Sequence, residues 1–328
     1  MRFMIAGYGS IGRRHLRNLR ALGQDDIVLY RTGKSTLPED ELAGLTVEYD
    51  LGAALAHQPD AVIIANPTAN HLDVALPAAE AGCHILMEKP ISHSLAGVAA
   101  LDEALRQGGG KLLVGFQFRF HPGLQKLAEL IRQQTAGRPL SARVEWGEYL
   151  PAWHPWEDYR QSYSARADLG GGVVVTLSHP LDYLRWLLGE VNGLWAFTGQ
   201  ISDLEIEVED IGEIGLRFES GAVASLHLDY YRRPPVHRLE ITCTEGLLRW
   251  DNADGAARWV KAEDGAEEVY LPPADFERNH LFLAEMQHFM DVMQGKAEPV
   301  CGLEGGQRAL ELALAVHQSA AEGRRITW

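Results

Sequence analysis

Residues 3–22 read FMIAGYGSIGRRHLRNLRAL, and this stretch decides the fold. It opens with apolar residues, passes through a glycine-rich turn, and ends in a segment whose leucines recur at helical spacing. An apolar strand that leads through G-x-G-x-x-G into a helix is the first unit of a dinucleotide-binding α/β domain. The stretch therefore predicts a Rossmann-type, doubly wound parallel sheet that starts near residue 3.

The three glycines of this turn have separate tasks in such a site. Gly7 permits the tight turn, Gly9 lets the backbone approach a pyrophosphate, and Gly12 lets helix and strand pack closely. Free N–H groups at the helix start then bind phosphate oxygens. A turn that merely uses glycine is the alternative, but the place at the head of a βα series favours cofactor binding. The predicted contacts are Gly7, Gly9, Ser10, Ile11 and Gly12.

Strand-like and helix-like segments alternate through the first third of the chain, which predicts a parallel sheet covered on both faces. The expected strands are 2–6, 27–30, 60–65, 84–87 and 111–116, and the expected helices are 10–22, 70–81 and 94–106. This region is assigned to an N-terminal NAD(P)-binding domain at 1–120.

The pattern changes after Pro122. A helix at 123–134 and a strand at 140–149 are expected, followed by several β-type stretches between 191 and 271 without helices between them. Consecutive strands predict an open, mostly antiparallel sheet in an α+β domain at 121–328. Helices at 276–294 and 303–322 close the chain.

Composition narrows the class of protein. The 328 residues carry a net charge of −15, which argues against nucleic acid as a partner. The three cysteines lie far apart, and there is no secretory leader and no apolar stretch of roughly 20 residues, so a cytoplasmic protein without membrane contact is expected. No histidine pair has metal-ligand spacing, so no metal is expected.

The end of the second expected strand bears on the choice of cofactor. An Asp or Glu there would bind the ribose 2′-OH of NAD. Here the strand is followed by Arg31, Thr32, Gly33, Lys34 and Ser35. Cations beside hydroxyls suit a 2′-phosphate, so NADP(H) is favoured over NAD(H), with an ordinary polar loop as the alternative.

Glu88, Lys89 and Pro90 follow the strand expected at 84–87. A lysine at the carboxyl end of a parallel strand points into the crevice where doubly wound sheets bind ligands. Its ammonium can donate to a substrate oxygen and stabilise developing alkoxide charge. Alone, the motif is weak, because most lysines only solvate the surface.

Five stretches occur in order: GYGSIG at 7–12, DAVIIANPTANH at 60–71, GCHILMEKP at 82–90, VGFQFRFHP at 114–122, and GGGVVVTLSHPLD at 170–182. With them the chain resembles, over its whole length, the Gfo/Idh/MocA oxidoreductases, the family of glucose–fructose oxidoreductase and inositol dehydrogenase. The resemblance implies a nicotinamide cofactor and sugar-like or cyclitol-like substrates. It also implies a homodimer or homotetramer built on the C-terminal sheet.

Carried over residue by residue, the resemblance places the family's lysine on Lys89 and its catalytic histidine on His179. Arg119 would lie near the substrate end of the cleft. Many dehydrogenases of the family have an Asp four residues before the histidine, but this chain has Val175 there, followed by Thr176. The residues that would border the cofactor are Asn66, Pro67, Thr68, His71, Glu88 and Lys89.

His179 has a structural alternative. Pro180 suits the first turn of a helix, His179 or Ser178 could cap it, and Asp182 would lie near the positive end of its dipole. That role does not require a histidine, whereas an imidazole suits proton transfer near neutral pH. Catalysis is therefore favoured for His179, and capping and substrate binding are weighed equally for Asp182.

Residues 148–172 form a long aromatic stretch, EYLPAWHPWEDYRQSYSARADLGGG. Long ordered loops are often functional, although large rings also dominate cores and interfaces. Tyr149, Trp153 and Arg160 are predicted to reach the substrate. The full predicted substrate set is Lys89, Arg119, Tyr149, Trp153, Arg160, Thr176, His179 and Asp182.

These features predict hydride transfer between NAD(P) and a carbinol or carbonyl of a sugar, sugar acid, nucleotide sugar or cyclitol. Lys89 would hold the reacting oxygen and His179 would exchange the proton. Two alternatives stay open: a glycoside hydrolase that uses bound NAD transiently, and a dinucleotide-binding sensor without catalysis.

Overall fold

The computed structural model describes residues 1–33 and 37–328 and divides the chain into two compact units. Unit 1 comprises Met1–Gln117, Asp168–Gly170 and Arg278–Leu310, and unit 2 comprises Phe118–Ala167, Gly171–Glu277 and Glu311–Trp328. The division expected from the sequence assigned residues 278–310 to the second domain. They cluster with unit 1 because apolar side chains of that segment pack into the core of its sheet.

Unit 1 is built on a six-stranded sheet in the order β3-β2-β1-β4-β5-β6, and every pairing in it is parallel. Ile5 of β1 lies between Leu29 of β2 and Ile63 of β4, and every residue of β1 and β4 is apolar and buried. This confirms the predicted Rossmann-type sheet. The strands are β1 (Phe3–Ala6), β2 (Ile27–Tyr30), β3 (Thr46–Glu48), β4 (Ala61–Ile64), β5 (His84–Glu88) and β6 (Leu112–Gly115).

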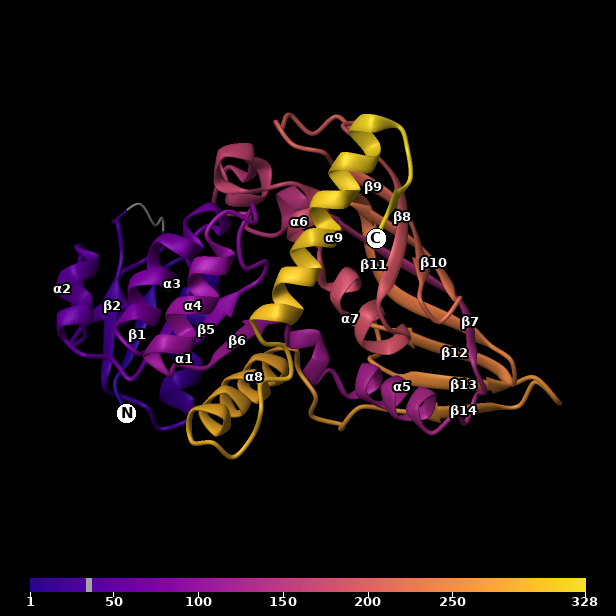
Figure 1. The fold of residues 1–328 in the computed structure, drawn as a ribbon, viewed down its shortest axis with the longest axis horizontal. Helices are drawn as coiled ribbons and strands as arrows, with labels where there is room; N and C mark the ends of the chain where they lie inside the picture. The colour runs from indigo at the N-terminus through magenta and orange to yellow at the C-terminus, as the bar shows by residue number, and fades with distance from the viewer. Residues whose placement is uncertain (34–36) are drawn as a thin grey trace. The chain divides into compact units, whose positions relative to one another are not determined.

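Helices flank this sheet (Figure 1). Helices α1 and α8 pack against each other, and Leu16, Leu19, Met286 and Phe289 from them share one core cluster with the strand residue Leu86. Helix α3 packs against α4, β4 and β5. The helices are α1 (Ser10–Ala21), α2 (Leu51–Ala56), α3 (His71–Glu80), α4 (Val98–Gly108), α8 (Arg278–Met293) and the start of α9 (Leu303–Glu322).

Unit 2 contains a nine-stranded sheet in the order β14-β13-β12-β11-β7-β10-β9-β8-β15. Only the β7–β10 pair is parallel among its described pairings, so the sheet is mixed but mostly antiparallel, as predicted. Its strands are β7 (Pro139–Tyr149), β8 (Val191–Gly199), β9 (Ile211–Phe218), β10 (Val223–Asp229), β11 (Tyr231–Cys243), β12 (Gly246–Asp251), β13 (Ala257–Lys261), β14 (Glu267–Tyr270) and β15 (Ile326–Thr327).

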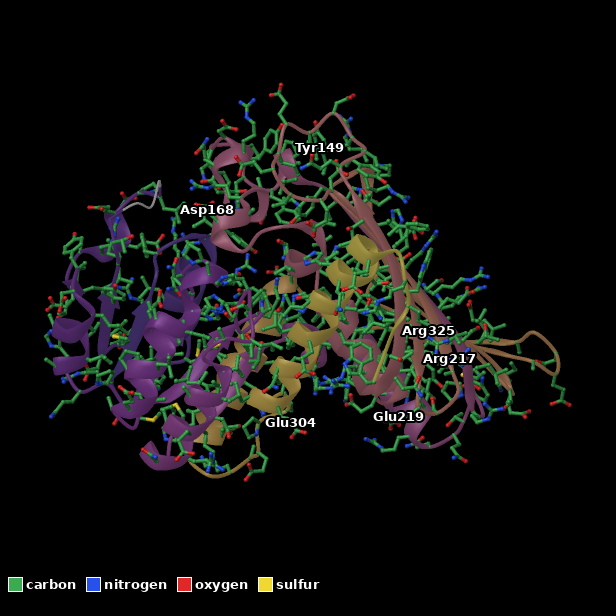
Figure 2. All side chains as sticks on the ribbon, turned by 45° about the horizontal axis from the view of Figure 1, so that its top comes forward. Tyr149, Asp168, Arg217, Glu219, Glu304 and Arg325 are labelled. Carbon is green, nitrogen blue, oxygen red and sulfur yellow. The ribbon has the colours of Figure 1, made fainter. Side chains whose placement is uncertain are left out.

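Helices α5 (Pro122–Arg132), α6 (Val173–Thr176) and α7 (His179–Leu188) pack with the later part of α9 on one face of this sheet (Figure 1). On β8, Trp195 and Phe197 are exposed, and their ring centroids lie 4.3 Å apart. The closing strand β15 pairs with β8. Arg217 and Arg325, both labelled in Figure 2, have side-chain atoms within 4 Å of the position that a Cβ on Gly193 would take. Within the described residues, no helix combines the length and hydropathy of a membrane span.

Candidate active site

The turn between β1 and α1 has the geometry that a pyrophosphate requires. Gly7 has φ +102°, which L side chains rarely adopt, and a Cβ on Gly12 would lie 2.2 Å from the Gly7 carbonyl oxygen. A Cβ on Gly9 would meet no described atom within 4 Å, so the backbone is open to a ligand there. Since no described side chain caps α1 and its first turn lacks acidic residues, its N–H groups remain available for phosphate oxygens. The turn therefore fits a dinucleotide.

Arg31 follows β2 and is 4% exposed. Its Nη1 donates to a carboxylate oxygen of Glu39 at 2.7 Å, and its guanidinium lies 5.6 Å from the centroid of the Tyr8 ring. Its Nε has no hydrogen-bond partner among the described residues. A guanidinium thus stands where an NAD site would have a carboxylate. Thr32 is exposed, and the predicted contact Lys34 lies outside the described residues.

The loop after β4 carries four of the predicted cofactor residues. Asn66 and Pro67 follow the strand, and Thr68 begins a short 3₁₀ turn and is buried. His71 begins α3, with Nδ1 2.9 Å from the carbonyl oxygen of Pro90 and Nε2 3.0 Å from that of Asn66. Burial lowers the pKa of His71. The structure thus places His71 between two backbone segments that end at the carboxyl edge of the sheet.

Glu88, the last residue of β5, belongs to a buried cluster that the sequence did not reveal. Its Oε1 lies 2.8 Å from Nε2 of His15 on α1. Glu285 of α8 is completely buried, and neither of its carboxyl oxygens has a hydrogen-bond partner among the described residues. The detectable signal was a charged residue on the apolar face of a helix, between Leu281 and Phe289.

The two carboxyl groups of this cluster have opposite charge preferences. Burial raises the pKa of Glu285 well above its ordinary value, and the charge of Glu88 adds to that shift. Burial also opposes ionisation of Glu88, but the hydrogen bond to His15 and the Lys89 ammonium outweigh it, so the pKa of Glu88 falls. Glu88 therefore favours the ionised form, and Glu285 favours the protonated form.

Lys89 is half-buried and lies one residue beyond the end of β5, at the carboxyl edge of the parallel sheet. This is the edge at which open α/β sheets bind ligands. The residue directly before it is held through His15, and the residue directly after it is held through His71. The backbone on both sides of Lys89 is therefore fixed by buried side chains.

His179 begins α7 in unit 2 and is 2% exposed. Its ring lies edge-on to Phe118 at 4.9 Å and tilted over Trp146 at 5.8 Å between centroids. Pro180 lies in the first turn, as expected, but Ser178 makes no side-chain capping hydrogen bond. The helix start therefore explains Pro180 without explaining the histidine.

Arg119 and Asp182 bind each other within unit 2. The guanidinium donates from Nε at 2.9 Å and from Nη2 at 2.8 Å, one bond to each carboxylate oxygen. Asp182 is buried in the first turn of α7. Val175 and Thr176 are buried in α6, just before that turn. This fork geometry fixes the orientation of Arg119 and joins two of the predicted substrate residues.

The three predicted residues of the aromatic stretch have separate surroundings. Tyr149, labelled in Figure 2, ends β7, and the Arg233 guanidinium lies 4.1 Å from its ring centroid. Trp153 packs edge-on against Tyr230 at 5.6 Å. Arg160 is exposed and forms ion pairs with Asp158 and Glu205. Tyr149 and Arg233 help to line a cavity of about 360 Å³.

Two family models match consecutive parts of the chain. The model of the NAD-binding Rossmann-fold oxidoreductase family matches residues 1–116, and that of the Gfo/Idh/MocA C-terminal domain matches residues 124–249. The chain belongs to the Gfo/Idh/MocA family. It is an oxidoreductase that binds a nicotinamide dinucleotide.

Individual relatives span the whole chain. It is 29% identical to myo-inositol 2-dehydrogenase of Thermotoga maritima, over 99% of this chain and 98% of that protein. It is 27% identical to D-apiose dehydrogenase of Paraburkholderia graminis, over 98% and 88% of the two chains. The WlbA dehydrogenase of Bordetella pertussis, solved with NADH and UDP-GlcNAcA, shares the fold with a TM-score of 0.83, at 24% identity over 100% and 98%.

Proposed function

We propose that this protein transfers a hydride between NADP(H) and a carbinol or carbonyl carbon of a sugar, sugar acid, nucleotide sugar or cyclitol. The proposal rests on the position of Lys89 at the carboxyl edge of the parallel sheet. The buried residues His15 and His71 hold the residues directly before and after it. Relatives named for oxidation of myo-inositol and D-apiose support the substrate class.

The roles follow from the chemistry of each side chain. In the direction of alcohol oxidation, Lys89 Nζ donates a hydrogen bond to the reacting oxygen and stabilises its developing negative charge. The His179 imidazole takes the hydroxyl proton. The bound nicotinamide supplies the acceptor for the hydride, which carries the electron pair of the C–H bond. In the reverse direction, His179 returns the proton to the alkoxide.

Further substrate contacts belong to the same proposal. Asp182, which is buried one helical turn after His179, binds the guanidinium of Arg119 through two hydrogen bonds. Thr176 ends the preceding helix α6. Tyr149, Trp153 and Arg160 would add contacts from the aromatic stretch. For these last three, only the residue types and their place in that stretch support a substrate role.

The preference for NADP(H) rests on Arg31. No carboxylate ends β2, and the guanidinium that follows the strand has an unpartnered Nε among the described residues. A bidentate guanidinium suits a 2′-phosphate. Mass spectrometry of dinucleotide released from the purified, denatured protein tests this preference. We expect NADP(H), and recovery of NAD(H) alone would refute it.

The catalytic proposal is tested with Lys89→Met. The variant should lose turnover by at least about a hundredfold while dinucleotide fluorescence titration gives an affinity within threefold of wild type. The matched control is Lys111→Met, because Lys111 is an exposed lysine at the start of the neighbouring strand. Turnover of a polyol panel is followed at 340 nm.

Two outcomes would contradict the proposal. Wild-type turnover by Lys89→Met would remove the lysine from the chemistry. Glycoside cleavage with no net change at 340 nm would instead identify a hydrolase that uses its cofactor transiently.

A further inference from the structure

His71 contacts the backbone immediately beyond Lys89. We propose that His71 is a positioning residue for Lys89, and that it acts by donating its Nδ1–H to the carbonyl oxygen of Pro90. The inference deepens the proposed function, since it assumes that Lys89 acts on the substrate. It concerns how the lysine is held and not which substrate it meets.

The contacts of His71 are short and fully enclosed. Nδ1 lies 2.9 Å from the Pro90 oxygen, Nε2 lies 3.0 Å from the Asn66 oxygen, and the side chain is 1% exposed. Proline has no N–H, so its carbonyl is the one backbone polar group through which this residue can be held. His71 therefore controls the backbone position just after Lys89.

The protonation chemistry of the ring supports a positioning role over a direct cofactor contact. A carbonyl oxygen only accepts hydrogen bonds, so the neutral ring donates to one of the two carbonyls and the imidazolium donates to both. Burial lowers the pKa of His71, whereas the Glu88 carboxylate opposes that shift. In either state, each ring hydrogen faces a backbone oxygen, which leaves none for a ligand.

Lys89 needs such an anchor because the sheet does not hold it. The ladder between β5 and β6 ends at the pairing of Glu88 with Gly115. Beyond Pro90, Ile91 is fully buried, and a Cβ on Gly306 would lie 2.7 Å from it. His71 holds the intervening carbonyl, and a displacement of about 1 Å at a reacting group can cost about a hundredfold in rate.

The first test compares His71→Phe with Val74→Ala. Phenylalanine fills the volume of the histidine ring but has no hydrogen-bond donor. Val74 is buried one turn later in α3, so Val74→Ala shows how much activity is lost when this helix is destabilised without loss of the histidine contacts. We expect kcat of His71→Phe to fall at least tenfold with KM within threefold, and Val74→Ala to stay within twofold of wild type in kcat. His71→Gln, which keeps one donor, should be intermediate and protects the test if the phenylalanine variant does not fold.

The second readout needs no substrate. Hydrogen–deuterium exchange should speed up at least fivefold in peptides covering 88–92 and 65–70 of His71→Phe and His71→Gln, and remain unchanged there in Val74→Ala. Unchanged exchange in both histidine variants, or equal loss of kcat in the valine control, overturns the inference. If exchange changes as expected while Lys89→Met remains active, His71 still holds the backbone beyond Lys89, but the proposed function fails and this anchor has no catalytic effect.

Discussion

At the scale of the residue, two glutamates show how neighbours decide charge. Glu88 has an imidazole nitrogen at 2.8 Å and an adjacent ammonium, so its ionised form is favoured despite burial. Glu285 has no hydrogen-bond partner among the described residues and faces the charge of Glu88. Of these two buried carboxyl groups, Glu88 therefore favours the charged form and Glu285 favours the neutral form.

This arrangement predicts how stability responds to pH. The folded-state pKa of Glu285 is raised above that of the unfolded chain, about 4.3. Folding then retains a proton that the unfolded chain releases, so stability is greatest below about pH 4.3 for this group and is lost as pH rises toward the folded-state pKa. Glu285→Gln cannot ionise, and it should gain stability relative to wild type by up to about 1.4 kcal/mol per pH unit in that window.

Urea unfolding at pH 6, 7 and 8 measures this difference. The exposed residue Glu80, at the end of α3, supplies the control Glu80→Gln, whose stability should track wild type. If the wild-type and Glu285→Gln curves run parallel with pH, Glu285 is not a protonated acid in the folded state.

The sequence predicted that Lys89 directly follows a strand, and β5 does end at Glu88. Sequence alone could not identify His15 or Glu285 as partners, because they lie 73 and 197 residues from Glu88 in sequence. No local pattern encodes such a pairing, which arises only when α1 and α8 cover the same sheet face. The resemblance predicts that His71 borders the cofactor, whereas its two contacts with backbone oxygens are visible only in the folded loop.

At the scale of the element, the β1–α1 turn separates two uses of glycine. A Cβ on Gly12 would collide with the Gly7 carbonyl at 2.2 Å, whereas a Cβ on Gly9 would meet only open space. Gly12 is thus needed for the turn itself, and Gly9 is needed only when a phosphate approaches the backbone.

The two alanine variants should therefore behave differently. Gly12→Ala should lose about 1–3 kcal/mol of stability and bind dinucleotide poorly. Gly9→Ala should unfold at the wild-type temperature yet bind NADPH at least tenfold more weakly. Differential scanning calorimetry and fluorescence titration give both quantities, and equal destabilisation by the two variants would count against this division.

Element boundaries were predictable where pattern and turn residue agree. The strand at 27–30 and the helix at 303–322 match the structure in full. The helix expected from residue 94 begins at Val98, after Gly97 adopts φ +86°. Strand β3 was missed because three residues are too few to show an alternating pattern. It forms only through its parallel pairing with β2, which the local sequence does not encode.

At the scale of the whole molecule, the three cysteines report on both units. All are buried thiols outside any disulfide, with Cys83 and Cys301 in unit 1 and Cys243 in unit 2. Burial raises the pKa of Cys83 and raises that of Cys243 to about 11. Because the thiolate is the reactive form, both groups are protected by burial and by chemistry.

A thiol count tests the integrity of both units at once. The native protein should react with fewer than one equivalent of a disulfide reagent such as DTNB, and the denatured protein with three. The thiols should stay unreactive with or without bound dinucleotide, since no cysteine is among the predicted cofactor or substrate residues. Rapid modification of a native thiol would show that one unit opens readily.

Neither unit is a continuous piece of the gene, and this bears on how the protein is made. Met286 and Phe289 of α8 complete the core over Ile5 and Leu86, yet the ribosome synthesises α8 only after the strands of the nine-stranded sheet up to β14. Until then, α1 covers this face of the first sheet without α8, and part of the apolar core stays exposed on the nascent chain. Unit 1 therefore reaches its final packing only near the end of translation. A chain truncated before residue 278 should expose apolar surface and be bound by chaperones or degraded by proteases.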